Sequence, residues 1–141
     1  MNLLLDTNVL SEVRRPAPDP NVLAWLDSVD EDRLFLSVAS LAELRRGGAL
    51  LDVGRRREAL AGWLAHDLPA RFAGRILPID PSVAERWGDV MAESHNSGIA
   101  LSVMDGFFAA TALAYELTLV TTKDFAAFGV ALFNPWEKGG S

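Results

Sequence analysis

Short apolar runs alternate with longer amphipathic segments along the chain. Five runs have the length and composition typical of strands, at residues 3–5, 34–38, 76–80, 117–121 and 131–133. The first two show no strict alternation of apolar and polar positions, which predicts strands buried on both faces of a parallel sheet. The last run is short and is expected to form an edge strand.

The segments between these runs carry apolar residues at helical spacing. The pairs Asp19-Pro20 and Asp80-Pro81 are typical helix starts, because Asp is a favoured cap and Pro fits the first turn. A long helix is predicted over about residues 51–72, and a largely apolar helix over residues 102–114. Strands that alternate with helices predict an α/β protein. We expect a single domain, residues 1–141, folded as a three-layer α/β/α sandwich around a mainly parallel sheet whose strand order stays open.

Composition narrows the possible functions. The 141 residues include no cysteine, which excludes disulfides and thiolate metal sites. No apolar run approaches the roughly 20 residues that span a bilayer, and no basic region precedes the first leucines, so we expect a cytoplasmic protein without a membrane partner. The net charge of −6 means that nucleic acid can approach only through a local basic patch or through bound cations.

Four acids stand just beyond a predicted strand or in the first turns of a helix: Asp6, Glu43, Asp105 and Asp124. In a parallel sheet these places converge on one edge, where ligands bind. Gathered carboxylates repel each other unless a cation neutralises them. Oxygen-only ligands favour Mg²⁺ or Mn²⁺, and such ions can polarise a phosphodiester and activate water.

Each acid also has a purely structural interpretation. Asp6 could cap the helix that follows it, and Asp124 could be an ordinary loop acid. The patterns Ser40-x-x-Glu43 and Ser102-x-x-Asp105 resemble capping boxes, in which the acid reaches back to the backbone. Any one acid fits these roles, but an unpaired charge at Asp105 would be costly in such an apolar helix, so the four together favour a metal site.

At these residues the chain resembles a known family. The segments at residues 4–10, 40–47, 103–112 and 119–125, followed by 133–137, are similar to the successive signatures of PIN-domain ribonucleases, above all the VapC-type toxins of bacterial toxin–antitoxin pairs. The match covers nearly the whole chain in order. It implies a PIN-like α/β/α sandwich, endoribonuclease activity that depends on Mg²⁺ or Mn²⁺, a homodimer, and a cognate antitoxin whose tail lies across or near the active site.

The resemblance also assigns roles to single residues. Asp6, Glu43, Asp105 and Asp124 fall on the family's acidic positions, expected to be catalytic and to hold the metal, while Asn8 and Thr121 fall on supporting polar positions. One departure concerns the stretch before Asp124. Many relatives carry an Arg-Asn pair and a spacer there, whereas this chain is shorter, so Asp124 can be displaced and Lys123 can stand in for the missing basic residue.

Two rival functions remain. A phosphatase of the haloacid dehalogenase type also begins with an acid after a strand, but it requires a second Asp where this chain has Asn8. A catalytically weak PIN-fold interaction module is the non-enzymatic alternative, and the shortened segment before Asp124 favours it. Arg14, Arg15, Arg45 and Arg46 flank the first two acidic motifs and can guide phosphate, bind an acidic partner segment or simply remain solvated. The four tryptophans are expected to make core or dimer contacts.

Overall fold

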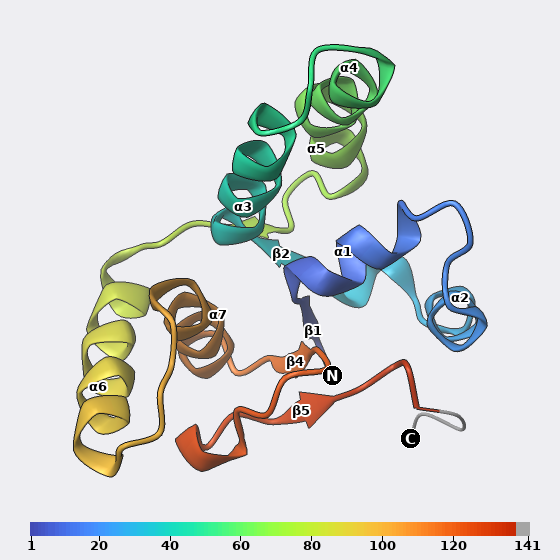
Figure 1. Ribbon diagram of the computed structural model, residues 1–141. Helices are drawn as coiled ribbons and strands as arrows, with labels where there is room; N and C mark the ends of the chain where they lie inside the picture. The colour runs from blue at the N-terminus through green and yellow to red at the C-terminus, as the bar shows by residue number, and fades with distance from the viewer. Residues whose placement is uncertain (138–141) are drawn as a thin grey trace.

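A parallel sheet of five strands forms the centre of the protein in the computed structural model, which describes residues 1–137. Figure 1 shows the sheet with helices around it. The strands are β1 (Leu3–Leu5), β2 (Leu34–Ser37), β3 (Ile76–Leu77), β4 (Thr118–Val120) and β5 (Leu132–Phe133). Their order is β3-β2-β1-β4-β5, and all neighbours run parallel. The chain therefore builds outward from β1 on one side and then returns to build β4 and β5 on the other. The strand order reverses beside β1, which makes this the point where ligands bind in such sheets.

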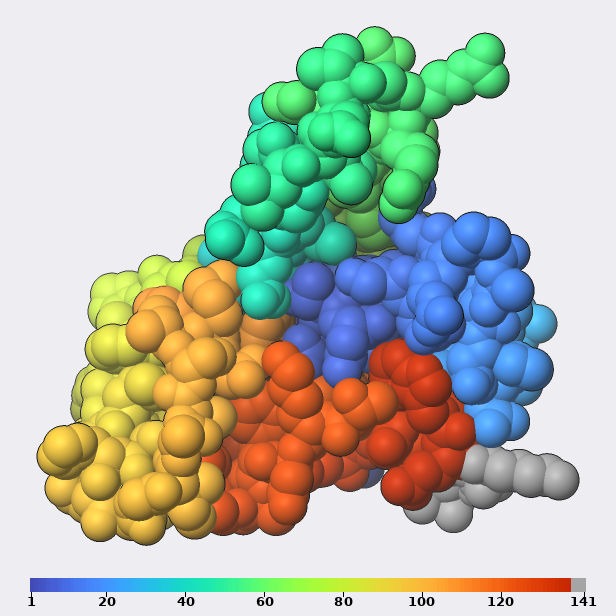
Figure 2. All heavy atoms as spheres, in the orientation of Figure 1, coloured from blue at the N-terminus to red at the C-terminus, as the bar shows by residue number. Residues whose placement is uncertain are grey.

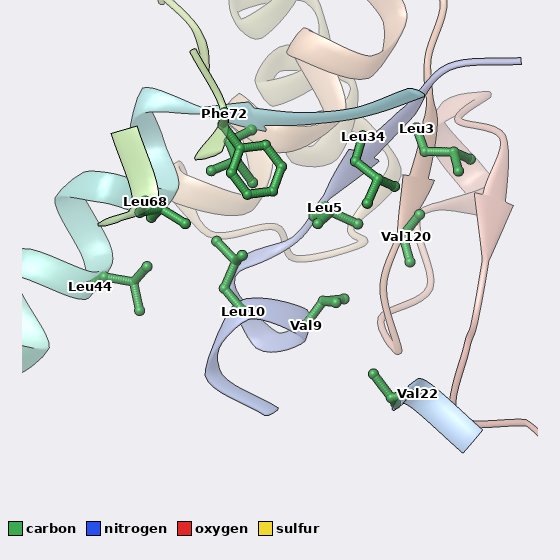
Figure 3. Close-up of a cluster of buried hydrophobic side chains, with 11 residues drawn as sticks. Leu3, Leu5, Val9, Leu10, Val22, Leu34, Leu44, Leu68, Phe72 and Val120 are labelled. Carbon is green, nitrogen blue, oxygen red and sulfur yellow. The ribbon is translucent and has the colours of Figure 1, made fainter. Parts of the chain in front are cut away.

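Each face of the sheet has its own apolar core. Leu3 and Leu5 point to one face, where they cluster with residues of α1 (Thr7–Val13), α2 (Pro20–Ser28) and α5 (Leu68–Arg71), and Figure 3 shows this cluster. Leu4 points to the other face and joins a second cluster built largely from α7 (Val103–Ala114) and the segment after β4. Consecutive side chains of a strand alternate between faces, so three leucines in a row are buried only when both faces are covered. The predicted three-layer α/β/α sandwich is confirmed.

The helices fall into three groups (Figure 1). On one side lie α1 (Thr7–Val13) and α2 (Pro20–Ser28), and on the other α6 (Pro81–Ser97) and α7 (Val103–Ala114). A third group projects from the sheet as a lobe (Figure 2). Its helical segments are α3 (Val38–Ala49), α4 (Arg55–Gly62), the π-helical turn η2 (Trp63–Asp67) and α5 (Leu68–Arg71). Two short 3₁₀ turns complete the described elements, η1 (Glu31–Arg33) and η3 (Ala126–Phe128).

Most predicted boundaries are right to within a few residues. Asp19 and Asp80 cap α2 and α6 as expected, each accepting hydrogen bonds from the first turn. The helix expected over residues 51–72 begins later, at Arg55, because the chain turns at Gly54, whose φ of 156° suits glycine. No helix within residues 1–137 has both the length and the hydropathy needed to cross a membrane.

The close packing of α6 on α7 depends on Gly106. A Cβ atom at this position would lie 2.5 Å from the Met91 sulfur and 3.0 Å from the Trp87 indole nitrogen. That indole donates a hydrogen bond to the carbonyl of Val103, in the first turn of α7. Gly106 therefore lets α6 approach the turn of α7 that carries Asp105.

Candidate functional site

Asp6 lies where β1 passes into α1. Its backbone nitrogen donates to the Val120 carbonyl of β4 at 3.0 Å, which continues the sheet by one residue. The side chain is 1% exposed, and its Oδ2 accepts from the Thr121 hydroxyl at 2.7 Å. Although Asp6 occupies the N-cap position, its side chain makes no capping hydrogen bond, so the interpretation of Asp6 as a side-chain cap is wrong.

The electrostatics of Asp6 follow from this burial. Loss of water raises the pKa of the Asp6 carboxyl above its ordinary value. The Thr121 hydrogen bond and the charge of Lys123 act in the opposite direction, while the charge of Asp105 raises the pKa further. At Asp6 the loss of water therefore outweighs the interactions that favour the charged form, a condition that a bound cation would relieve.

Glu43 reaches the same edge from α3. The Thr7 hydroxyl donates to Glu43 Oε1 at 2.6 Å and lies 3.0 Å from the Ser40 hydroxyl. Because Thr7 has one proton to give, Ser40 acts as the donor to Thr7. The structural interpretation of Ser40 and Glu43 as a capping box is wrong, since Ser37 caps α3 by accepting from the nitrogen of Ala39. The helix starts three residues earlier than that box requires, and Glu43 faces α1.

Asp105 reaches the edge from the first turn of α7. Ser102 caps this helix by accepting from the backbone nitrogen of Asp105 at 3.1 Å, so half of the predicted capping box is present. The other half is absent, because the Asp105 carboxylate turns to Lys123, whose Nζ donates to Oδ1 at 2.8 Å. The Asp105 carboxylate therefore does not play the capping role of the structural interpretation and pairs with the Lys123 ammonium group instead.

Lys123 binds the site with its backbone as well as its side chain. Its backbone nitrogen donates to the Thr121 hydroxyl at 3.1 Å, and the same hydroxyl donates to Asp6. Burial lowers the pKa of Lys123, but the hydrogen bond to Asp105 and the charges of Asp6, Asp105 and Glu43 outweigh it, so the net pKa is raised. One ammonium group therefore lies in the field of three carboxylates.

Asp124 lies apart from this group. It is exposed, and its Oδ1 accepts from the backbone nitrogen of Ala126 at 2.9 Å, which orders the start of η3. Within residues 1–137 no hydrogen bond joins it to Asp6, Glu43 or Asp105. The structure brings together three of the four predicted acids and leaves the fourth in a local turn.

The two predicted supporting residues both lie next to the acids. Thr121 links Asp6 to the backbone of Lys123, as described above. Asn8 donates from its amide to the Thr122 hydroxyl at 2.9 Å, and this contact ties α1 to the end of β4. Its Oδ1 is buried and has no hydrogen-bond partner among the described residues, so an acceptor is left unused beside the acidic edge.

The donor set suits a hard divalent cation in its chemistry. Carboxylates and the free Asn8 oxygen are ligands that Mg²⁺ and Mn²⁺ prefer. As the side chains stand, no three Asp, Glu or His residues in the described part of the chain are placed to share one ion. Each carboxylate instead holds another partner: Thr121 for Asp6, Thr7 for Glu43 and Lys123 for Asp105. Each of these bonds engages one oxygen of its carboxylate, so the second oxygens of Asp6 and Glu43 could still bind an ion, and only Lys123, itself a cation, would compete with it.

A groove of about 910 Å³ leads away from Thr7 and Glu43 between α1 and the α3–α4 part of the lobe. Its floor is largely apolar, and Arg14, Arg15 and Arg56 line it. Arg15 is paired with Glu12 at 3.2 Å, and the Arg14 guanidinium lies over the Trp63 ring at 4.7 Å. Arg14 and Arg15, which directly follow α1, thus border the site as predicted and also contact the residues that form its walls.

The tryptophans are engaged within the protein, as expected for core contacts. Trp25 packs against Phe133 and Trp87 stacks on Phe107. Trp136 donates to the carboxylate of Glu12 at 3.3 Å.

Sequence reasoning missed the hydroxyl that positions Glu43 and gave Lys123 only a minor place. Thr7 directly follows Asp6 and was interpreted only as part of a helix start. Its hydrogen bond to Glu43, 36 positions away, could not be predicted from that local pattern. Lys123 was visible as a basic residue beside Asp124, but its pairing with Asp105 depends on how β4 is placed beside α7.

The fold and the site together define a class of protein: a parallel α/β/α sandwich that gathers carboxylates at its switch point. The chain belongs to the PIN domain family, whose model matches residues 3–130. It is 43% identical over 137 residues to toxin FitB of Neisseria gonorrhoeae, covering 96% of this chain and 99% of the relative.

Two further comparisons agree. The VapC ribonuclease Y4jK of Sinorhizobium fredii is 39% identical over 137 residues, with 96% of this chain and 98% of the relative covered. The crystal structure of FitAcB from Neisseria gonorrhoeae superposes with a TM-score of 0.89 at 42% identity, covering 96% of this chain and 99% of that chain. The resemblance inferred from the sequence motifs is therefore confirmed at the level of family and fold.

Proposed function

We propose that this chain is a metal-dependent endoribonuclease that acts as the toxin of a toxin–antitoxin pair. The observation that carries the proposal is the convergence of Asp6, Glu43 and Asp105, from three separate elements, on the switch-point edge of a PIN-family sheet. Relatives named as a toxin and as a ribonuclease, each matching nearly the full length of this chain, support it.

The three acids would hold Mg²⁺ or Mn²⁺, with the Asn8 oxygen available beside them. A divalent cation supplies polarisation of the phosphodiester and stabilises charge on the leaving oxygen. Thr121 fixes the orientation of Asp6, and Thr7 fixes that of Glu43, so neither carboxylate has to be ordered when substrate arrives. Asp124 would have a lesser part, because it serves the η3 turn.

The substrate and partner follow from the same reasoning. An acidic chain approaches RNA through its bound cations and through local groups of arginines, and Arg14, Arg15 and Arg56 line the groove that begins at Glu43. A ribonuclease toxin must be silenced in the cell that makes it, so we propose a cognate antitoxin and a homodimeric toxin. Co-expression with the product of an adjacent small gene for a DNA-binding protein should yield a stable, inactive complex.

The activity test uses the purified full-length chain and a mixed RNA substrate. Cleavage should require Mg²⁺ or Mn²⁺ and stop with EDTA. Asp105→Asn should abolish cleavage, whereas Asp89→Asn, an equal change of charge on the exposed surface of α6, should leave it intact. Cleavage that persists in EDTA, or that survives Asp105→Asn, would contradict the proposal.

The alternative is an interaction module with the same fold and weak or absent catalysis. It is favoured by the pairing of Asp105 with Lys123 and by the place of Asp124 outside the acidic group. Under this alternative the protein binds its partner and dimerises, yet RNA stays intact at every metal concentration. Comparing RNA cleavage with partner binding in the same preparation separates the two functions.

A further inference from the structure

The Lys123 ammonium group occupies the acidic edge. Its Nζ lies 2.8 Å from Asp105 Oδ1, and the Asp105 side chain is 19% exposed while that of Lys123 is 47% exposed. Among residues 1–137 the structure contains three ion pairs, and the other two, Arg15–Glu12 and Arg71–Glu31, involve none of the three gathered acids. Lys123 is therefore the cation that this chain itself directs to the site.

Hydrogen bonds fix the backbone of Lys123 close to Asp6. Thr121 accepts from the Lys123 nitrogen and donates to Asp6, so a single hydroxyl ties both residues to the end of β4. The aliphatic stem then carries the ammonium across to α7. The side chain is half exposed, so it can move into solvent without disturbing the core.

We propose that Lys123 is a built-in counter-cation that holds the acidic edge together in the metal-free protein and competes with the divalent ion for Asp105. This inference rests on the proposed function, because it assumes a metal at this edge. The lone pair of Asp105 Oδ1 that accepts from the ammonium group is not available to a metal ion, and the positive charge of Lys123 weakens the attraction of the second oxygen for that ion. Two cations at the same edge also repel each other, so metal entry displaces the ammonium from Asp105.

The competition has a consequence for the protein as it stands. While Lys123 holds Asp105, no three carboxylates of the described chain are placed around one point. The Lys123–Asp105 pair thus stabilises the metal-free protein and lowers the affinity of the site for a metal ion. Removing the ammonium should free Asp105 to join Asp6 and Glu43 around an ion.

The test is calorimetric titration of Mn²⁺ into the full-length protein. We expect Lys123→Met to bind Mn²⁺ about tenfold more tightly than the wild type, the order of effect of one partly screened charge pair. Lys123→Arg keeps a cation and should stay near the wild-type affinity. Arg86→Met is the matched control, because it removes one positive charge from an exposed position on α6 and should also stay near wild type.

A second measurement reports on the same residue without metal. In EDTA, Lys123→Met should unfold at a lower temperature than the wild type, because three carboxylates lose their counter-cation. Saturating Mn²⁺ should raise its Tm by more than that of the wild type. Lys123→Gln provides the same comparison if the methionine variant folds poorly.

The outcomes separate this inference from the proposed function. Unchanged or weaker Mn²⁺ binding in Lys123→Met overturns the counter-cation role while leaving the nuclease proposal intact. An equal gain in Arg86→Met also overturns it, because the effect would then come from net charge. If neither the wild type nor Lys123→Met binds Mn²⁺, the proposed function fails. Binding in Lys123→Met alone supports the inference.

Discussion

A buried carboxylate lies near each end of helix α1, and the two carboxylates differ in the hydrogen-bond donors that surround them. Asp6 at the first end is 1% exposed, and Glu12 near the other end is 6% exposed. Glu12 accepts hydrogen bonds from the backbone of Asp19, from Arg15 and from the indole of Trp136. The Asp6 side chain accepts from the Thr121 hydroxyl, and no guanidinium or indole within residues 1–137 donates to it.

The pKa values of the two carboxyls record this difference. Hydrogen bonding from the Asp19 nitrogen, with help from Arg15 and Trp136, lowers the pKa of Glu12 below its ordinary value despite burial. Burial prevails at Asp6 and raises its pKa. The Glu12 carboxylate thus links α1 to Asp19, just before α2, and to Trp136 near the C-terminus. At Asp6 the hydrogen bonds and nearby charges do not offset the cost of burying the carboxylate. This lowers stability and leaves the carboxylate available to a cation.

The largest expected effect is that of Asp6→Asn. Removing this charge should reduce metal-dependent RNA cleavage by about a hundredfold or more, since an ion would lose its most buried ligand. In EDTA the same variant should be at least as stable as the wild type, because an amide is cheaper to bury than a carboxylate and can still accept from Thr121. Cleavage assays and thermal unfolding on one preparation check both. Near-normal cleavage would contradict the role given to Asp6.

Glu12→Gln should behave in the opposite way. An amide brings two donors to a place already crowded with donors, so Tm should fall by several degrees. The folded fraction should keep its Mn²⁺ affinity, because Glu12 lies outside the acidic edge. Thermal unfolding followed by Mn²⁺ titration at low temperature measures the two properties separately. A loss of metal binding without a loss of stability would show that the two ends of α1 are not independent.

The two ends should also respond oppositely to pH in metal-free protein. Because the folded pKa of Glu12 is lowered, its stabilising contribution is present above the ordinary value of about 4.3 and is lost as pH falls through the folded pKa. Because the folded pKa of Asp6 is raised, its contribution is present below about 3.9 and is lost as pH rises through the folded pKa.

Urea unfolding in EDTA from about pH 7 to about pH 3.5 should therefore give two trends. The deficit of Glu12→Gln relative to wild type should be largest near neutrality and shrink toward the acid end. The advantage of Asp6→Asn should also be largest near neutrality and shrink toward the acid end, with the opposite sign. Parallel curves for either variant and the wild type would mean that the replaced carboxyl titrates alike in both states.

The smallest expected effect is that of Asp124→Asn. The amide oxygen can still accept from Ala126, so η3 should keep its start and stability should be unchanged. Cleavage should change by no more than about threefold, against the loss of about a hundredfold expected for Asp6→Asn. A loss as large as that of Asp6→Asn would mean that Asp124 turns inward when a metal is bound.

The sequence alone was sufficient for features that depend on neighbouring residues. Leu3, Leu4 and Leu5 form a run that is stable only between two covered faces, and this predicted the layers around the parallel sheet. An acid placed directly after such a run must emerge at the carboxyl end of the strand, which predicted the position of Asp6. The cap at Ser102 was likewise visible, because it bonds to a residue three positions away.

Tertiary structure decided everything that depends on which surfaces meet. The strand order, with β1 between β2 and β4, follows from packing whole elements, and it sets Thr121 against Asp6 across 115 positions. The tertiary structure pairs Thr7 with Glu43 and Lys123 with Asp105, so neither acid completes the capping box that its local sequence resembles. Local patterns state which hydrogen bonds a residue is able to make, but the folded chain determines which partner lies within reach.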